Sequence, residues 1–125
     1  MVDRKDPDHG MCSAAMRSER QAVLVPQPTL TEVCYLVNSR LGTAVEREFL
    51  LGLSASDWGL EPLTRPDLDR IVDLLGTYAS ANLGFVDAAT VAIAERLDIE
   101  RIYTLDRRDF AMVRPRHVSA FIIAP

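Results

Sequence analysis

Residues 87–106, DAATVAIAERLDIERIYTLD, decide the expected fold because they join two different hydrophobic patterns. The segment 87–97 is apolar over several helical turns, which predicts a buried helix. The segment 101–105 is a short run rich in β-branched and aromatic residues, which predicts a strand that ends at Asp106. A buried helix that leads directly into a strand is typical of α/β domains with a parallel sheet.

The rest of the chain repeats this alternation. Short apolar runs predict further strands at residues 22–25, 58–60 and 121–124. Apolar residues at helical spacing predict further helices at residues 6–20, 28–41, 43–53 and 65–78. Gly42 is expected to end a helix, and residues 82–84 to form a turn. We therefore expect an α/β domain with a mainly parallel sheet covered by helices on both faces.

Composition narrows the class of protein. The 125 residues are 48% hydrophobic and 26% charged, which is the balance of one globular domain spanning residues 1–125. Because no apolar run has the length of a membrane helix and the N-terminus is highly charged, we expect a soluble, cytoplasmic protein. Cys12 and Cys34 stand alone, which is typical of reduced thiols. The net charge of −4 would repel a polyanion, so nucleic-acid binding would require a local basic patch or a metal ion.

Four carboxylates are candidates for a site. Ligands bind at the carboxyl ends of parallel strands, and both Asp106 and Glu32 are expected to follow a strand at that edge. Asp87 begins the apolar helix, and Asp109 shares a helical face with Asp106. Taken singly, Glu32 is typical of a solvated helix and Asp87 and Asp106 of helix N-caps. Together, carboxylates repel by roughly 1–4 kcal/mol per close pair, which favours a bound Mg²⁺ or Mn²⁺ and phosphodiester hydrolysis.

Three segments, in the same order along the chain, resemble acidic motifs of the PIN-domain ribonuclease toxins of the VapC type. They are TEV at residues 31–33, GFVDAA at residues 84–89 and TLDRRDF at residues 104–110. The resemblance covers essentially the whole chain. It implies a PIN-like three-layer α/β/α sandwich, endoribonuclease activity dependent on Mg²⁺ or Mn²⁺, homodimerisation, and neutralisation by a small VapB-like antitoxin.

The resemblance also assigns roles to the candidate acids. By matching position, Glu32, Asp87 and Asp106 would form the acidic core that holds the metal ion. Asp109 would be an auxiliary acid of the metal site. The alternative, that Asp109 caps the turn at Asp106, is nearly as well supported.

The chain departs from the family at its start. Relatives open with a hydrophobic strand that ends in a metal-binding Asp followed by Thr or Ser, and we expect that segment roughly ten residues upstream of Met1. A start site assigned too late, or a shortened expressed chain, is the favoured explanation, because a sheet that lost this strand would leave backbone edges uncovered. The alternative is a truly shortened, catalytically inactive protein.

Basic residues near Asp106 add a second feature. Four arginines, Arg107, Arg108, Arg114 and Arg116, could guide an RNA backbone to the acidic edge, and they are about equally well explained as solvated surface residues.

Two rival functions stay open at this point. One is a catalytically impaired PIN-like module that binds an antitoxin or itself, and the other is a metal-dependent phosphatase of another α/β fold.

Overall fold

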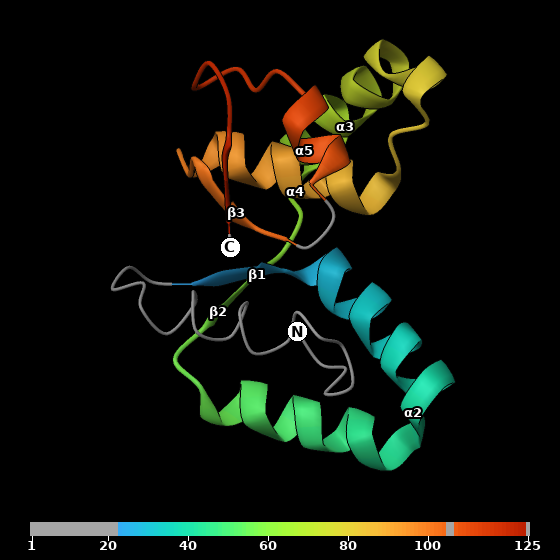
Figure 1. Cartoon of the computed structure of the whole chain (residues 1–125). Coiled ribbons are helices and arrows are strands. Elements are labelled where there is room, and N and C mark those ends of the chain that lie inside the picture. Colours follow the sequence, from blue (N-terminus) through green and yellow to red (C-terminus); the bar gives the residue numbers. More distant parts are fainter. Residues whose placement is uncertain (1–22, 105–106, 125) are drawn as a thin grey trace. The chain divides into compact units, whose positions relative to one another are not determined.

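A computed structural model describes residues 23–104 and 107–124 (Figure 1). The expected helix at residues 6–20 and the end of the expected strand at 105–106 lie outside the described residues. The chain divides into two compact units, residues 1–61 and 62–125. Each unit is described by itself below.

The described part of the first unit contains a parallel strand pair joined by a long helical connection. Strand β1 (Leu24–Pro26) pairs in parallel with β2 (Gly59–Glu61), with Leu24 opposite Gly59 and Pro26 opposite Glu61. Parallel strands need a crossover between them, and α2 (Gln27–Ala55) supplies it. At Gly59 a Cβ atom would lie 2.6 Å from Leu24 Cδ2, so the glycine leaves room for the Leu24 side chain.

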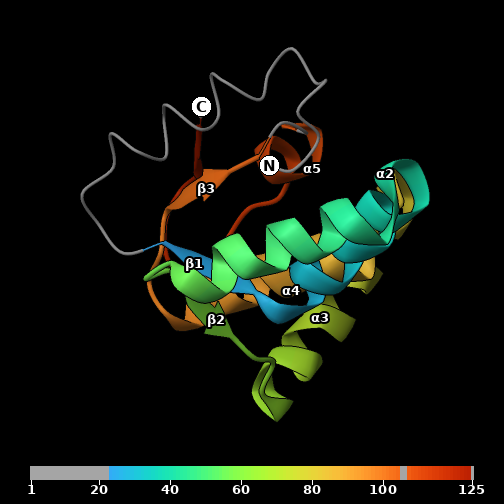
Figure 2. The same cartoon turned by 90° about the horizontal axis from the view of Figure 1, so that it is seen from below.

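Helix α2 consists of two segments that meet at Gly42. Gly42 adopts φ 87° and ψ 175°, a backbone conformation that strongly favours glycine and breaks the helix. Asn38 Nδ2 bridges the break by donating to Thr43 Oγ1 at 3.1 Å and to Glu46 Oε1 at 2.9 Å. Figures 1 and 2 show the chain turning there, so that the second segment leads back toward the strand pair. The expected end of a helix at Gly42 is confirmed.

The second unit builds an α/β structure of its own. Helix α3 (Arg65–Thr77) packs against α4 (Phe85–Arg96), and a short 3-10 turn, η1 (Ala79–Ala81), lies between them in sequence. Strand β3 (Arg101–Tyr103) pairs in parallel with β4 (Ile122–Ala124), and α5 (Arg108–Met112) lies in the connection. The described strands therefore form two parallel pairs, β1 with β2 and β3 with β4.

The core of the second unit is centred on α4. Ala88, Ala89 and Val91 are completely buried, and Leu74 of α3 and Val113 after α5 are 1% exposed. Phe110 and Phe121 complete this core, with their rings edge to face and their centroids 6.3 Å apart. A helix buried on most of its surface explains why residues 88–94 are almost entirely apolar.

The predicted helices and strands among the described residues are confirmed, with short shifts at their ends, whereas α5 and η1 were not predicted. The α/β class with parallel strands is confirmed. Helix α4 begins at Phe85, two residues earlier than expected, because Gly84 takes the N-cap position. No helix of residues 23–104 and 107–124 has the length and apolar character to cross a membrane.

Candidate functional site

Asp87 occupies the first turn of the core helix α4. Because Gly84 is the N-cap, Asp87 is the third residue of the helix, and the alternative interpretation as an N-cap is wrong. The residue is half-buried, and the two residues that follow, Ala88 and Ala89, are completely buried. A carboxylate in the first turn also interacts favourably with the positive end of the helix dipole. The backbone position of Asp87 is therefore fixed by the packing of the core.

The other predicted acids are distributed along the chain. Glu32 is exposed on the first segment of α2 and belongs to the first unit. Asp109 is half-buried in the first turn of α5 and belongs, like Asp87, to the second unit. Asp106 lies outside the described residues. The convergence of Glu32, Asp87 and Asp106 on one site accordingly stays a prediction.

Metal-binding side chains do not cluster within the described ranges. Residues 23–104 and 107–124 contain no group of three His, Cys, Asp or Glu side chains placed to hold a metal ion. Cys34 is a half-buried free thiol, and burial, followed by the nearby carboxylate of Glu46, raises its pKa. A raised pKa disfavours the thiolate, the form in which a cysteine acts as a nucleophile or metal ligand.

The four predicted RNA-binding arginines differ in their contacts. Arg107 donates from Nη2 to the Ile123 carbonyl at 3.2 Å, and Arg108 donates from Nη2 to the Ala81 carbonyl at 3.4 Å. Both side chains are exposed. Their guanidinium groups contact backbone carbonyls of the second unit, so part of their donor capacity is used within the fold.

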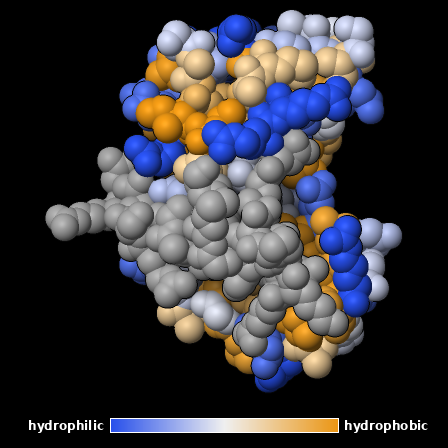
Figure 3. All heavy atoms as spheres, in the orientation of Figure 1, coloured by the Kyte–Doolittle hydropathy of each residue, from blue (hydrophilic) through white to orange (hydrophobic). Residues whose placement is uncertain are grey.

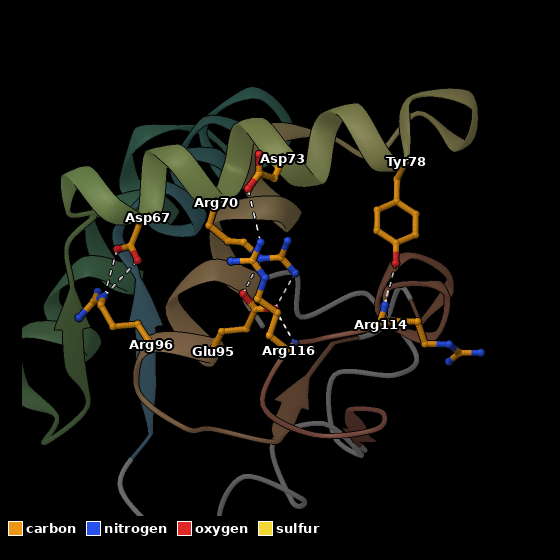
Figure 4. Close-up of polar contacts among 8 residues, drawn as sticks. All are labelled: Asp67, Arg70, Asp73, Tyr78, Glu95, Arg96, Arg114 and Arg116. Atoms are coloured by element: carbon orange, nitrogen blue, oxygen red, sulfur yellow. Dashed lines mark hydrogen bonds and ion pairs between the residues drawn. The ribbon is translucent and has the colours of Figure 1, made fainter.

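The other two arginines lie in the loop that follows α5. Arg116 Nη2 lies 3.4 Å from Asp73 Oδ2, in an ion pair whose side chains are more than half exposed. Arg114 contacts the protein through its backbone, because its N–H donates to the Tyr78 hydroxyl at 2.8 Å. In Figure 4 the Arg114 side chain extends away from Tyr78. RNA contact by these arginines stays a prediction.

Two ion pairs between α3 and α4, shown in Figure 4, were not predicted from the sequence. Arg70 binds Glu95 in a side-on, two-bond geometry, with Nε to Oε1 at 2.7 Å and Nη2 to Oε2 at 2.9 Å. Arg96 Nε lies 3.1 Å and 3.2 Å from the two carboxylate oxygens of Asp67, which is 3% exposed. The Arg70–Glu95 pair, with two donors on two oxygens, fixes orientation as well as distance, whereas Arg96 Nε is shared between both oxygens of Asp67. These pairs clamp α4, and hence the helix that carries Asp87, onto α3.

The environment of both carboxylates favours their ionised form. Burial acts to raise the pKa of Asp67, but hydrogen bonds from Arg96 and Thr64 outweigh it and lower the pKa. Burial likewise acts to raise the pKa of Glu95, and the Arg70 guanidinium together with the Arg116 backbone N–H lowers it. Both carboxylates are therefore charged partners of arginine in the folded protein.

One sequence signal could have identified Asp67. Thr64 is the N-cap of α3, its hydroxyl accepts from the Asp67 N–H at 3.4 Å, and Asp67 Oδ2 accepts from the Thr64 N–H at 2.9 Å. This reciprocal capping box is readable from the spacing of Thr64 and Asp67. The pairing of Glu95 with Arg70, by contrast, joins residues 25 positions apart, and sequence periodicity carries no signal for it.

His117 also contributes to structure. Its Nε2 lies 2.7 Å from the Ile99 carbonyl, and because a carbonyl only accepts, Nε2 carries the hydrogen. The half-buried ring packs edge-on against Phe121, with centroids 5.8 Å apart. The ring therefore anchors the loop before β4 to the segment after α4.

Known proteins resemble this chain along nearly its whole length. The PIN domain family matches residues 1–114. Ribonuclease VapC26 of Mycobacterium tuberculosis is 31% identical over 123 residues, which are 98% of this chain and 91% of that protein. The crystal structure of Mycobacterium tuberculosis VapC20, described as a toxin that cleaves the sarcin-ricin loop, superposes with a TM-score of 0.82 at 21% sequence identity. That match covers 94% of this chain and 89% of the other and confirms the predicted fold. The chain therefore belongs to the PIN-domain family and is a VapC-like member of it.

Proposed function

We propose that this protein is a metal-dependent endoribonuclease and the toxin of a toxin–antitoxin pair. The observation that carries the proposal is the identity of 31% to a ribonuclease over 98% of the chain, which includes the segments with the predicted acids. The half-buried position of Asp87 at the start of the core helix supports it. Core packing fixes the backbone at this position, so the carboxylate would be held in place for a metal ion.

The predicted acids suit a hard divalent cation. Glu32, Asp87 and Asp106 offer oxygen ligands, which Mg²⁺ and Mn²⁺ prefer, and these three residues would hold the ion. When bound, the ion supplies an activated water molecule and stabilises the charge that develops on the phosphodiester. Asp109, in the first turn of α5, would be an auxiliary acid of the same site.

The basic residues would bind the substrate. Arg107, Arg108, Arg114 and Arg116 lie in or beside α5 and its following loop, and arginine donors match the geometry of phosphate oxygens. They would hold the RNA backbone against the acidic site and offset the repulsion expected from a net charge of −4. Because RNA is the substrate, the cytoplasm is the proposed site of action.

The proposed protein partners are a VapB-like antitoxin and a second copy of the chain. Apolar side chains remain at the surface of α2, where Leu36, Leu50 and Leu51 are 41%, 38% and 52% exposed. Figure 3 shows apolar side chains of the described residues at the visible surface, bordered by hydrophilic ones. Exposed apolar surface of this kind supports a protein partner. The 125 residues are proposed to act as one PIN-like domain.

Cleavage of RNA tests the proposed function. Purified chain, and a version extended upstream to include the expected first strand and its Asp, are incubated with total RNA in Mn²⁺ or Mg²⁺, in EDTA, and with Asp106→Asn in place of Asp106. We expect the extended version to cleave with either metal ion, not to cleave in EDTA, and to lose about 100-fold or more activity in the variant. Equal cleavage in EDTA and in Mn²⁺ would refute metal dependence, and cleavage of small phosphate esters without cleavage of RNA would favour a phosphatase.

A further inference from the structure

We infer that Tyr78 is a positioning residue, which fixes Arg114 for contact with a phosphate of the RNA backbone. The inference rests on the proposed function, because it assigns a residue to the binding of that substrate. It starts from the loop Val113–His117, here called the arginine loop. Along this loop exposure alternates, with Val113 and Pro115 buried and Arg114 and Arg116 exposed.

The arginine loop is held at successive positions, twice through its backbone and once through the His117 side chain. The Arg114 N–H donates to the Tyr78 hydroxyl at 2.8 Å, and the Arg116 N–H donates to Glu95 Oε2 at 2.8 Å. His117 then donates from Nε2 to the Ile99 carbonyl. Figure 4 shows the first two acceptors, Tyr78 at the C-cap of α3 and Glu95 on α4. The loop is therefore ordered before any ligand binds.

The two exposed arginines of the loop differ in whether their guanidinium groups have a partner within the described protein. The Arg116 guanidinium lies against Asp73, which is an acceptor within the protein. The Arg114 guanidinium has no hydrogen-bond or ion-pair partner among residues 23–104 and 107–124, and in Figure 4 it extends away from the α3–α4 pair. Of these two side chains, Arg114 has its full set of donors available to a ligand.

A fixed backbone makes this guanidinium a better phosphate ligand. Ordering a flexible loop during binding reduces affinity, and a loop that is already ordered avoids that cost. The Tyr78 hydroxyl contributes by accepting from the Arg114 N–H itself, so it fixes the base of the side chain that makes the contact. Tyr78 thus acts through Arg114 and does not touch the RNA.

Phosphate is favoured over an acidic protein surface by the position of Arg114 in the chain. It follows α5, whose first turn carries Asp109, and it shares this stretch with Arg107 and Arg108. A run of arginines beside a proposed nuclease acid matches the repeated negative charge of an RNA backbone. Binding of an acidic antitoxin segment at Arg114 is treated as an outcome of the test.

The test is a double-mutant cycle on RNA binding. A fluorescein-labelled, mixed-sequence single-stranded RNA is titrated with wild-type chain, Tyr78→Phe, Arg114→Gln and the double variant, in EDTA over a series of KCl concentrations. Loss of one phosphate contact should reduce the slope of log K against log salt by about 0.7, which corresponds to about five-fold weaker binding at 0.1 M. We expect this change for Arg114→Gln, and weaker binding for Tyr78→Phe.

The coupling between the two substitutions separates positioning from a general structural role. Tyr78→Phe should have no further effect in the Arg114→Gln background, since Tyr78 acts through that residue. In cleavage assays both single variants should raise KM and leave kcat unchanged. Tyr35→Phe, at a tyrosine that is 71% exposed on α2, and Arg40→Gln, on the same helix, are the matched controls and should leave binding unchanged.

Several outcomes would overturn the inference. Additive effects of the two substitutions would show that Tyr78 acts elsewhere, and an unchanged salt slope for Arg114→Gln would show that Arg114 contacts no phosphate. The second result is informative even if Tyr78→Phe fails to fold, because Arg114 is exposed. Loss of antitoxin binding with intact RNA binding would assign Arg114 to the protein partner.

Binding in EDTA keeps this inference separate from the proposed function. A chain that binds RNA with the expected slopes but cleaves none in Mn²⁺ would refute the proposed nuclease and leave Arg114 as a phosphate ligand. A chain that cleaves RNA equally well with and without Arg114 would refute the inference and leave the nuclease.

Discussion

The two units differ in how their described residues bury apolar surface. In the second unit, α4 and its neighbours form a core with many completely buried side chains and two arginine–carboxylate clamps. In the described part of the first unit, Val37 is the side chain that reaches comparable burial, and α2 leaves Leu51 and other large apolar side chains exposed. The helix that carries Asp87 is thus stabilised locally, whereas the surface of α2 has apolar area available to a partner.

This difference predicts that the same leucine-to-alanine substitution changes the free energy of unfolding by different amounts in the two units. Leu74→Ala, at a leucine that is 1% exposed in the second unit, should reduce the free energy of unfolding by about 2–5 kcal/mol because it opens a cavity in the core. Leu51→Ala, at a leucine that is 52% exposed on α2, should change it by less than about 1 kcal/mol. Urea denaturation measures both. Equal losses would contradict the comparison.

Removing the Asp67 clamp should have the next largest effect on stability. Asp67→Ala removes the capping partner of Thr64 and the ion pair with Arg96, which should cost about 2–4 kcal/mol, since Arg96 retains partial access to solvent. The matched control is Asp69→Ala, at an exposed position two residues along the same helix. A similar loss in both variants, measured by urea denaturation, would mean that the clamp does not stabilise α3 against α4.

Acid should weaken the second unit through the same carboxylates. Because the pKa values of Asp67 and Glu95 are lowered by folding, their contribution is fully present above the unfolded values of about 4 and is lost as pH falls through the lowered folded values. The stability difference between wild-type chain and Glu95→Gln should therefore shrink as pH falls below about 4. Urea midpoints from pH 7 to pH 3 measure this difference. A difference that stays constant with pH would contradict the assignment of charge to Glu95.

Much of the fold was predictable because hydrophobic periodicity reports local burial. The apolar helix α4, the break at Gly42 and the short parallel strands all follow from patterns within one element. The boundary of α4 was misplaced by two residues because an N-cap glycine has no side-chain signal of its own. Strand lengths were less predictable, since they depend on where the partner strand ends.

The roles of the site residues were harder to predict from the sequence than the fold, for a physical reason. A carboxylate has the same pattern in sequence whether it binds a metal ion, caps a helix or pairs with arginine, and the choice depends on residues far along the chain. Asp67 and Glu95 proved to be arginine partners, and Arg116 pairs with Asp73 across 43 positions. Only the three motifs that contain Glu32, Asp87 and Asp106, taken together and in order, carried a family signal specific enough to indicate chemistry before the structure.

The proposed role of Asp87 is tested most directly by a paired substitution. Asp87→Asn removes the charge at the start of the core helix, and Asp98→Asn removes one at an exposed position after the same helix, where the backbone has φ 56° and tolerates asparagine. Single-turnover cleavage of RNA in Mn²⁺ is compared after both variants are shown to melt as the wild-type chain does. We expect a loss of about 100-fold or more for Asp87→Asn and unchanged cleavage for Asp98→Asn. Cleavage at the wild-type rate by folded Asp87→Asn would contradict the proposed metal site.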